Sequence, residues 1–172
     1  MAEGTLELEI VTPQGVALKE RVDEVIAPGA EGEFGVLSGH LPMLAALNIG
    51  LLHYRKGQKM HDVAVGNGFA EVLEDKTLVL TDRFTTRDDA KGKVLEVRKR
   101  LKDVDHQLER WEGELDDPAR LDLVEEEQWL AVKLELIGDP PPPRVLENTL
   151  RADLSQIGPP MEENESNDAA ER

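Results

Sequence analysis

The apolar residues of this chain follow two different periods, and the change between them limits the folds that it can adopt. From Thr5 to Phe84, short apolar stretches are interrupted by Gly, Pro or Asp about every eight to twelve residues, which is typical of an all-β sandwich or barrel. Beyond Arg83, apolar residues recur at steps of three and four, which indicates amphipathic helices. The sequence therefore predicts a β domain over residues 1–85, a helical hairpin over 86–138 and a tail over 139–172.

The predicted strands of the β domain alternate apolar and polar residues. Leu6, Leu8 and Ile10 alternate with Glu7 and Glu9, so we expect one face of this strand to be buried and the other to face solvent. Gly66-Asn67-Gly68 is predicted to form a tight turn, because Asn and Gly accept positive φ angles. The predicted strands are Leu6–Val11, Glu20–Ala27, Gly35–Leu37, Ile49–Arg55, Lys59–Val65, Phe69–Glu74 and Thr77–Thr81.

The helical segment is predicted to form two antiparallel helices. The first has more than about twenty residues and one narrow apolar stripe, made of Val94, Val97, Leu101, Val104, Leu108, Trp111 and Leu115. Asp116-Asp117-Pro118 supplies a capping carboxylate and a first-turn proline for the second helix. That helix should end at Gly138 and has a less regular stripe, made of Leu121, Val124, Leu130, Leu134 and Ile137.

The two tryptophans and the tail carry separate expectations. Trp111 falls on the apolar stripe and is expected in the hairpin core, whereas Trp129 falls outside it and is expected to contact the β domain or a partner chain. Pro140–Pro143 favour an extended spacer. A segment over 145–157 has apolar residues on one side, but it is too short for a stable isolated helix and is either docked or unfolded. The last residues are polar and acidic and are expected to be disordered.

The composition of the chain points to protein partners. Its net charge is −16, so the phosphates of nucleic acids and an anionic lipid surface would repel it. The chain has no cysteine, and we find neither a catalytic motif nor a Gly-rich phosphate loop that ends in Lys-Ser or Lys-Thr. No stretch reaches the roughly 18 apolar residues of a membrane helix. We therefore expect a protein without catalytic activity, cofactor or metal, which is soluble or peripheral to a membrane.

The segment from Val25 to Pro42, VIAPGAEGEFGVLSGHLP, is the most specific stretch of the sequence. Its four glycines predict a shaped loop that turns repeatedly. Glu31 and Glu33 would repel a phosphate and no lysine follows, so a docking edge for another protein is favoured over a nucleotide site. His40 lies in a rigid corner, where its ring either hydrogen-bonds within its own turn or contacts a neighbouring chain.

Four pieces of the first half, in this order, resemble the epsilon subunit of F-type ATP synthases, which is called delta in mitochondria. They are LELEIVTPQG from residue 6, VDEVIAPGAEGEFGVLSGHLPMLAAL from residue 22, GNGFAEV from residue 66 and LVLTDRF from residue 78. The resemblance covers about half of the chain and implies an N-terminal antiparallel β-sandwich of about ten short strands. The expected fold class is thus β + α, a sandwich followed by an antiparallel helical hairpin and an extended, partly disordered tail.

The resemblance also implies a function. Members of the family are non-catalytic central-stalk (rotor) subunits, so the sandwich would bind the gamma subunit and the polar loops of the membrane-embedded c-ring, peripherally at the cytoplasmic face of the bacterial plasma membrane. Glu33 stands at the glutamate that meets the c-ring in the family, with Glu31 beside it, and His40 lies at the rotor-facing end of the sandwich. We therefore expect Glu31, Glu33 and His40 to be contact residues.

A basic cluster on the first helix has two interpretations. In bacterial relatives such side chains contact an acidic segment of the beta subunit and restrain ATP hydrolysis, which implies contact roles for Lys91, Arg98 and Arg100. The alternative is a solvated helix face. The acidic run Glu125-Glu126-Glu127 on the second helix opposes contact with an acidic partner, so the sequence leaves inhibition open.

One departure from the family concerns nucleotide binding. Some relatives carry a nucleotide-sensing motif of the form Leu/Ile-Asp-x-x-Arg-Ala at the start of the first helix, where this chain reads DDAKGK from Asp88 to Lys93. We therefore expect no tight ATP binding by the isolated chain. Two other functions stay open at this point: an enzyme or small-molecule binder built on a β-sandwich, and a free-standing adaptor that uses the hairpin and the acidic tail.

Overall fold

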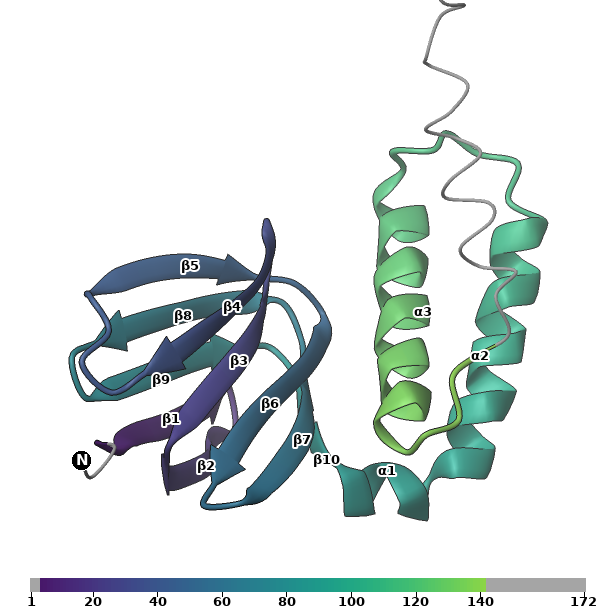
Figure 1. The fold of residues 1–172 in the computed structure, drawn as a ribbon. Coiled ribbons are helices and arrows are strands. Elements are labelled where there is room, and N and C mark those ends of the chain that lie inside the picture. Colours follow the sequence, from purple (N-terminus) through teal and green to yellow (C-terminus); the bar gives the residue numbers. More distant parts are fainter. Residues whose placement is uncertain (1–3, 142–172) are drawn as a thin grey trace, which may run out of the picture. The chain divides into compact units, whose positions relative to one another are not determined.

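The computed structural model describes residues 4–141, which form ten strands followed by three helices (Figure 1). The strands are β1 (Leu6–Thr12), β2 (Gly15–Val22), β3 (Glu24–Gly29), β4 (Gly32–Leu37), β5 (Met43–Leu47), β6 (Gly50–Lys56), β7 (Lys59–Val65), β8 (Gly68–Leu73), β9 (Lys76–Thr81) and β10 (Phe84–Thr86). The helices are α1 (Arg87–Gly92), α2 (Val94–Glu109) and α3 (Pro118–Leu136). The predicted β-sandwich of about ten strands followed by a helical hairpin is confirmed.

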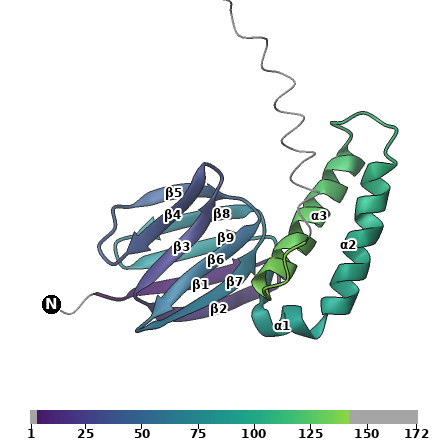
Figure 2. The same ribbon diagram turned by 45° about the vertical axis from the view of Figure 1, so that its right-hand side comes forward.

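The strands form one continuous path that folds over on itself. Its order is β10-β7-β6-β3-β5-β8-β9-β1-β2, and β4 pairs with β3 beside this path. Only Gly29 and Leu47 pair between β3 and β5, so at this weak junction the path turns over and its two halves face each other as layers (Figures 1 and 2). The β1–β9 pair is parallel, and the other strand pairs of the described residues are antiparallel.

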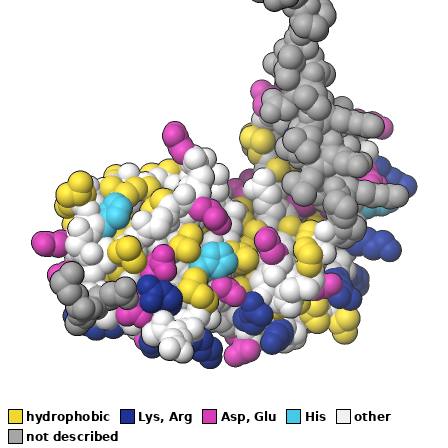
Figure 3. All heavy atoms as spheres, viewed as in Figure 1, with side chains coloured by type: hydrophobic (Ala, Val, Ile, Leu, Met, Phe, Trp, Pro, Cys, Tyr) yellow, Lys and Arg dark blue, Asp and Glu magenta, His cyan; other side chains and the backbone are white. Residues whose placement is uncertain are grey.

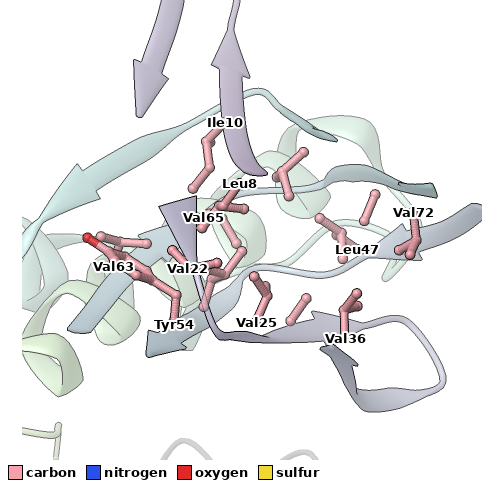
Figure 4. Close-up of a cluster of buried hydrophobic side chains, with 14 of the residues drawn as sticks. Leu8, Ile10, Val22, Val25, Val36, Leu47, Tyr54, Val63, Val65 and Val72 are labelled. Atoms are coloured by element: carbon pink, nitrogen blue, oxygen red, sulfur yellow. The ribbon is translucent and has the colours of Figure 1, made fainter. Parts of the chain in front are cut away.

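The core of the sandwich lies between the two layers (Figure 4). Leu6, Leu8 and Ile10 are buried while Glu7 and Glu9 are not, as the alternation in this strand predicts. Aliphatic side chains from both layers complete the core, among them Val22, Val25, Val36, Leu47, Leu52, Val63, Val65, Val72 and Val79. Apolar burial of this kind is the main stabilising contribution to such a domain.

The predicted strand Glu20–Ala27 is wrong, because the chain changes partner at Asp23. β2 pairs with β1 up to Val22, and β3 pairs with β6 from Glu24. Asp23 fixes the crossing point, since its backbone N–H donates to the carbonyl oxygen of Arg55 (2.8 Å) and its carboxylate accepts from the backbone N–H of Gly57 (2.5 Å). An Asp between two strands is a turn signal that the continuous apolar pattern conceals.

The predicted repeatedly turning loop in the glycine-rich segment is also wrong. Residues 24–37 form a β-hairpin, β3–β4, whose single turn is made of Ala30 and Glu31. Gly32 has a φ angle of 120° directly after this turn, whereas Gly29 and Gly35 lie within strands. Gly29 is needed for close approach, because a Cβ atom there would lie 2.5 Å from the carbonyl oxygen of Gly32.

The first predicted helix is shorter than expected and is preceded by a separate helical turn. Thr86 caps α1, its hydroxyl accepting from the backbone N–H of Asp89 at 3.3 Å. α2 ends at Glu109, and Trp111 lies in the connection to α3, where its Nε1–H donates to the carbonyl oxygen of Glu114 (3.1 Å). The prediction that Trp111 belongs to the hairpin core is therefore wrong, because its indole is partly exposed and holds the connection in place.

α3 begins and ends as the sequence predicts. The carboxylate of Asp117 accepts from the backbone N–H of Ala119 (2.8 Å), and Pro118 occupies the first turn. Gly138, which follows the C-cap residue Ile137, has a φ angle of 80°, typical of a helix end.

α3 has two apolar faces. One packs against α2, which lies beside it in both views (Figures 1 and 2), and this face is formed by Leu123, Leu130, Leu134 and Ile137. The other packs against the sandwich and α1, where Trp129 and Leu136 are buried in one cluster with Ala64 and Ala90. The predicted stripe residue Leu121 is 51% exposed, because the inward-facing residue of this turn is Leu123. The expected contact of Trp129 with the β domain is confirmed.

The predictions for the tail lie almost entirely outside the described residues. Pro140 and Pro141 belong to neither a helix nor a strand, and the segments over 142–172, including 145–157, are not described. Of the helices in residues 4–141, none is both long and apolar enough to span a membrane.

Candidate functional site

A row of exposed apolar side chains crosses the outer surface of the layer formed by β5, β8, β9, β1 and β2. The strand register places Ala46, Phe69 and Leu80 opposite one another on β5, β8 and β9. The same row continues from Leu80 to Val11 on β1 and to Val16 on β2. We define Ala46, Phe69, Leu80, Val11 and Val16, together with Leu44, as the outer apolar row.

Four residues of the outer apolar row, Leu44, Phe69, Leu80 and Val16, are large and exposed. Leu44 is 73% exposed, Phe69 is 55% exposed and Leu80 is 48% exposed, while their strand neighbours Ala70 and Val79 are fully buried. Directly opposed residues project from the same face of a sheet, so these side chains are close together rather than scattered. A contiguous exposed apolar surface of this kind in a water-facing domain typically marks a protein contact.

Charged side chains border the row on β1, β2 and β9. Lys76 contacts Glu7 (Nζ–Oε1 3.4 Å) and Glu9, and Lys19 contacts Glu7 (Nζ–Oε1 3.4 Å). The hydrogen bond from Lys76 lowers the pKa of Glu9, and the pKa of Lys76 is raised in return. The arrangement of an apolar centre with a charged rim is the usual anatomy of a protein interface.

The turn that carries Glu31 lies beside one end of the outer apolar row. The backbone N–H of Ala30 donates to the carbonyl oxygen of Ala46 (2.9 Å), which joins the β3–β4 turn to the row through β5. Glu31 and Glu33 are both exposed, and neither is ion-paired within the described residues. The structure thus places an acidic, solvent-facing turn next to an apolar surface.

His40 lies at the opposite end of β4 from Glu31. The backbone N–H of Gly39 donates to the carbonyl oxygen of Glu74 (2.8 Å), which holds this corner near the end of β8, and Figure 1 shows the two ends of β4 apart. His40 Nδ1 lies 2.7 Å from the carbonyl oxygen of Leu41, to which only a protonated Nδ1 can donate. Of the two alternatives for His40, the structure shows the hydrogen bond within its own turn. It does not bring His40 together with Glu31 and Glu33.

The basic residues expected on the helices differ in their surroundings. Arg100 forms a two-point contact with Glu126 of α3 (Nε–Oε1 and Nη2–Oε2, both 2.6 Å), and Arg98 binds Asp139 (Nε–Oδ2 2.8 Å). Arg100 lowers the pKa of Glu126 by this hydrogen bond. Lys91 is exposed on α1 and has no ion-pair partner within residues 4–141. Figure 3 shows basic side chains over α2, interspersed with acidic ones.

Two ion pairs and one apolar cluster join the helical segment to the sandwich, and one of the pairs links Arg87 of α1 to Asp62 of β7 (Nη2–Oδ2 2.9 Å). Arg83, in the β9–β10 turn, binds Glu125 of α3 (Nη2–Oε1 2.6 Å). Trp129 and Leu136 of α3 are buried in the same cluster as Ala64 of β7. Lys133 Nζ lies 5.2 Å from the ring centre of Trp129, and burial lowers the pKa of this lysine.

Metal-ligating side chains are not clustered within residues 4–141. This part of the chain contains no group of three or more His, Asp or Glu side chains that could hold a metal ion. A cavity of about 450 Å³ lies at the far end of the hairpin, lined by His106, Arg110, Trp111 and Leu123 among others. Apart from Leu123 these belong to the end of α2 and the α2–α3 connection.

The sequence interpretation missed the outer apolar row. Its signal was present, because Phe69 alternates with the buried Ala70 and Leu80 alternates with the buried Val79. Both faces of such strands carry apolar side chains, so the alternation of apolar and polar residues that marks the buried and the exposed face is weak. Only the register between strands shows that the outward-facing residues are neighbours.

Known proteins match this chain over both halves, and more strongly over the first. The model of the family "ATP synthase, Delta/Epsilon chain, beta-sandwich domain" matches residues 5–87. The "ATP synthase epsilon chain" of Trichlorobacter lovleyi is 41% identical over 124 residues, which cover 67% of this chain and 89% of that protein. This chain belongs to the delta/epsilon chain family of ATP synthases. Its resemblance to that family is thereby confirmed.

Other relatives of this delta/epsilon-family chain match mainly its sandwich. The epsilon chain of Nitratidesulfovibrio vulgaris (strain Miyazaki F) is 52% identical over 87 residues, or 51% of this chain and 65% of that protein. The matched part thus spans slightly less than two thirds of that relative. The epsilon chain of Syntrophobacter fumaroxidans is 54% identical over 80 residues.

Solved structures show the same fold. One is from the structure of the Euglena gracilis mitochondrial ATP synthase OSCP/F1/c-ring, with a TM-score of 0.59 and 21% identity over 86% of this chain and 82% of that chain. Another is from the central stalk/c-ring structure of the Tetrahymena thermophila mitochondrial ATP synthase, with a TM-score of 0.51 and 14% identity over 80% of this chain and 99% of that chain. At these identities the comparison concerns the fold of the delta/epsilon-family chain.

Proposed function

We propose that this chain is a non-catalytic central-stalk subunit of an F-type ATP synthase, whose sandwich joins the gamma subunit to the c-ring. Membership of the delta/epsilon family supports the assembly, and the outer apolar row supports a large protein contact on the sandwich. The row is the observation on which the proposal mainly rests. In the assembled enzyme the chain would be peripheral to the membrane, at the cytoplasmic face.

The outer apolar row is the surface that we assign to the gamma subunit. Burial of a large side chain such as Leu44 or Phe69 against a partner stabilises a complex by about 1–2 kcal/mol each. Several adjacent side chains on rigid strands lose little conformational entropy on binding, which makes such a face suitable for transmitting torque. The charged border of Glu7, Glu9 and Lys76 would then form the rim of the interface.

The acidic β3–β4 turn is the surface that we assign to the polar loops of the c-ring. Glu31 and Glu33 are exposed and adjacent to the outer apolar row, so one partner assembly can contact the turn and the row at the same time. An exposed carboxylate contributes little to affinity by itself, but it selects a partner with basic residues. His40, at the other end of β4, would belong to a separate contact.

The hairpin is the part that would regulate hydrolysis, if it extends toward the beta subunit. Extension would break the Arg100–Glu126, Arg98–Asp139 and Arg83–Glu125 pairs of the folded hairpin. It would thereby release three guanidinium groups that an acidic partner could bind. Lys91 is accessible in the folded hairpin as well.

The test is assembly of the purified full chain with the gamma subunit and the c-ring of the same organism. Phe69→Glu places a charge in the centre of the outer apolar row and should weaken binding to gamma at least about tenfold. Met60→Glu is the matched control, since Met60 is 46% exposed on β7, outside the row, and this variant should bind normally. Equal affinities of the two variants would exclude the row as the gamma contact.

The c-ring contact is tested separately. Glu33→Lys reverses a charge on an exposed strand position and should reduce assembly with the membrane sector while leaving the gamma complex intact. Unchanged proton-coupled ATP synthesis in the reconstituted enzyme would contradict this assignment. The alternative of a free-standing adaptor predicts that the tagged chain is recovered without gamma and without the alpha–beta head.

A further inference from the structure

Glu127 of α3 occupies a position where the hairpin would be expected to carry an apolar side chain. Leu123, Leu130 and Leu134 form the face of α3 that packs against α2. Glu127 follows Leu123 by four residues and precedes Leu130 by three, which is the spacing of a continuous inward stripe. Its side chain is only partly exposed. A carboxylate in this position loses hydration, which disfavours its charged form.

Asp105 lies on α2, the helix that packs against this face of α3, and its carboxyl group interacts with that of Glu127. It follows the fully buried Val104 and lies one turn beyond Leu101, at the edge of the α2 stripe. Its Oδ1 atom is buried and has no hydrogen-bond donor among the described residues. Two ionised carboxylates cannot provide one, because both are acceptors only. A protonated Glu127 would supply the missing donor. Burial, and then the hydrogen bond with Asp105, raise the pKa of Glu127 to about 7.

The charged groups around the pair do not neutralise it. On α3 the nearest influential cation is Arg120, two turns before Glu127, which lowers the pKa of Glu127 but less than burial and Asp105 raise it. Its Nη1–H donates to the carbonyl oxygen of Leu115 (3.0 Å). On α2, Lys102 and His106 flank Asp105 and are exposed.

The other elements packed against α3 direct their charges elsewhere. The Arg83 guanidinium, between β9 and β10, is paired with Glu125, and Arg100 of α2 is paired with Glu126. The contacts of α3 with α1 and β7 in the described residues centre on the apolar cluster of Ala64, Ala90 and Trp129. Glu127 is therefore the member of the acidic run that has a carboxyl group, and not a cation, opposite it.

We propose that Asp105 and Glu127 share one proton across the α2–α3 interface, and that this proton holds the hairpin closed, so that the hairpin opens more readily once the proton is lost. With the proton present, the pair forms a hydrogen bond and carries one negative charge. Without it, two partly buried carboxylates repel each other between the helices. This device concerns the chain by itself and does not depend on the proposed rotor function.

The direction of the pH effect follows from proton binding in the two states. Glu127 has a pKa of about 7 in the closed hairpin and its ordinary value of 4.5 when the hairpin opens. The closed state therefore binds more protons between these values. The stabilisation that this proton contributes is fully present below about pH 4.5 and is lost as the pH rises through 7. The opening equilibrium constant would rise by up to about tenfold per pH unit within this window.

Hydrogen exchange of the α2 and α3 amides in the full chain tests the proposal. After correction for the intrinsic exchange rate, protection of these amides should fall by about 10- to 100-fold between about pH 5 and pH 8, while that of β1 and β9 should not. Glu127→Gln cannot titrate, and its amide can donate to Asp105, so its hairpin protection should be high and independent of pH. A flat profile in the unmodified chain would overturn the proposal.

Three controls separate the pair from other titrating groups. Glu135→Gln alters an exposed glutamate of α3, and His106→Gln removes the histidine beside Asp105, so both variants should keep the pH dependence. Asp105→Asn removes the facing carboxylate and should reduce the dependence. Persistence of the full dependence in Glu127→Gln, or titration of the Glu127 side chain at an ordinary pKa in carbon-detected NMR, would refute the shared proton.

Discussion

Replacing Trp129 with alanine is expected to detach the hairpin from the sandwich without unfolding the sandwich. Trp129 is 8% exposed and is buried in one cluster with Ala64 and Leu136. The core of the sandwich is a separate cluster that contains neither Trp129 nor any other residue of the helices. Loss of the indole should therefore weaken the cluster that joins the hairpin to the sandwich and leave the core of the sandwich intact.

The expected magnitude follows from the burial of the side chain. Truncation of a buried tryptophan to alanine costs about 3–5 kcal/mol. We expect the lower end of this range, because the ammonium group of Lys133 is partly buried against the Trp129 ring. Removal of the ring would let water reach this charge, which offsets part of the loss. A loss of about 3 kcal/mol corresponds to about a hundredfold increase in the population of the detached hairpin.

Hydrogen exchange and chemical denaturation of the full chain distinguish detachment of the hairpin from unfolding of the sandwich. Protection of α3 amides should fall by about a hundredfold in Trp129→Ala, while β1 and β9 stay protected. Trp111→Ala is the matched control, since Trp111 is partly exposed in the α2–α3 connection, and it should cost less than about 1.5 kcal/mol. It also leaves Trp129 as the single tryptophan, whose fluorescence then reports the attachment. Loss of protection throughout the sandwich in Trp129→Ala would refute two separable units.

Further predictions concern the turn, the hairpin and nucleotide binding. Gly29→Val should destabilise the sandwich by about 2 kcal/mol in denaturant unfolding, because its Cβ would meet the carbonyl oxygen of Gly32, whereas Gly35→Val has open space and should be nearly neutral. Glu126→Gln should weaken the hairpin by less than about 1 kcal/mol at neutral pH. Because Arg100 lowers the pKa of Glu126 below its ordinary value of 4.5, this difference should be present above pH 4.5 and be lost as the pH falls through the lowered pKa. Calorimetry of the isolated chain should show no micromolar ATP binding, and such binding would contradict our interpretation of Asp88–Lys93.

The sandwich and the limits of α3 could be predicted because local chemistry specifies them. The alternation of Leu6, Leu8 and Ile10 marks a half-buried strand whatever its neighbours are. Asp117 and Gly138 satisfy backbone requirements at helix ends that arise within one turn of the chain. The cap of α1 at Thr86 carried the same kind of local signal, and the interpretation of a single long helix missed it.

Most of the predicted hairpin stripe lies in the α2–α3 core, but the outer surfaces and the first turns of α3 could not be predicted, because they depend on contacts between distant residues. β5 (Met43–Leu47) is apolar on both faces, so the sequence does not distinguish the buried Leu47 from the exposed Leu44. The stripe of α3 contains Glu127 in place of an apolar residue, which shifted the predicted stripe to Leu121. Arg98 and Arg100 were expected either to contact an acidic partner or to lie on a solvated helix face. In the structure they pair with Asp139 and Glu126, which are distant in the sequence.

The separation of the apolar clusters has a consequence for how such chains diverge. The core of the sandwich, including the partly buried side chains packed against it, ends at Phe84. The cluster that joins the sandwich to the helices is small, since two of its four buried residues are the alanines Ala64 and Ala90. Substitutions and changes of length beyond residue 87 therefore perturb little of what the sandwich needs to fold. The match to the beta-sandwich domain of the family covers residues 5–87. Changes in the helical half are therefore expected to leave the fold of the sandwich intact.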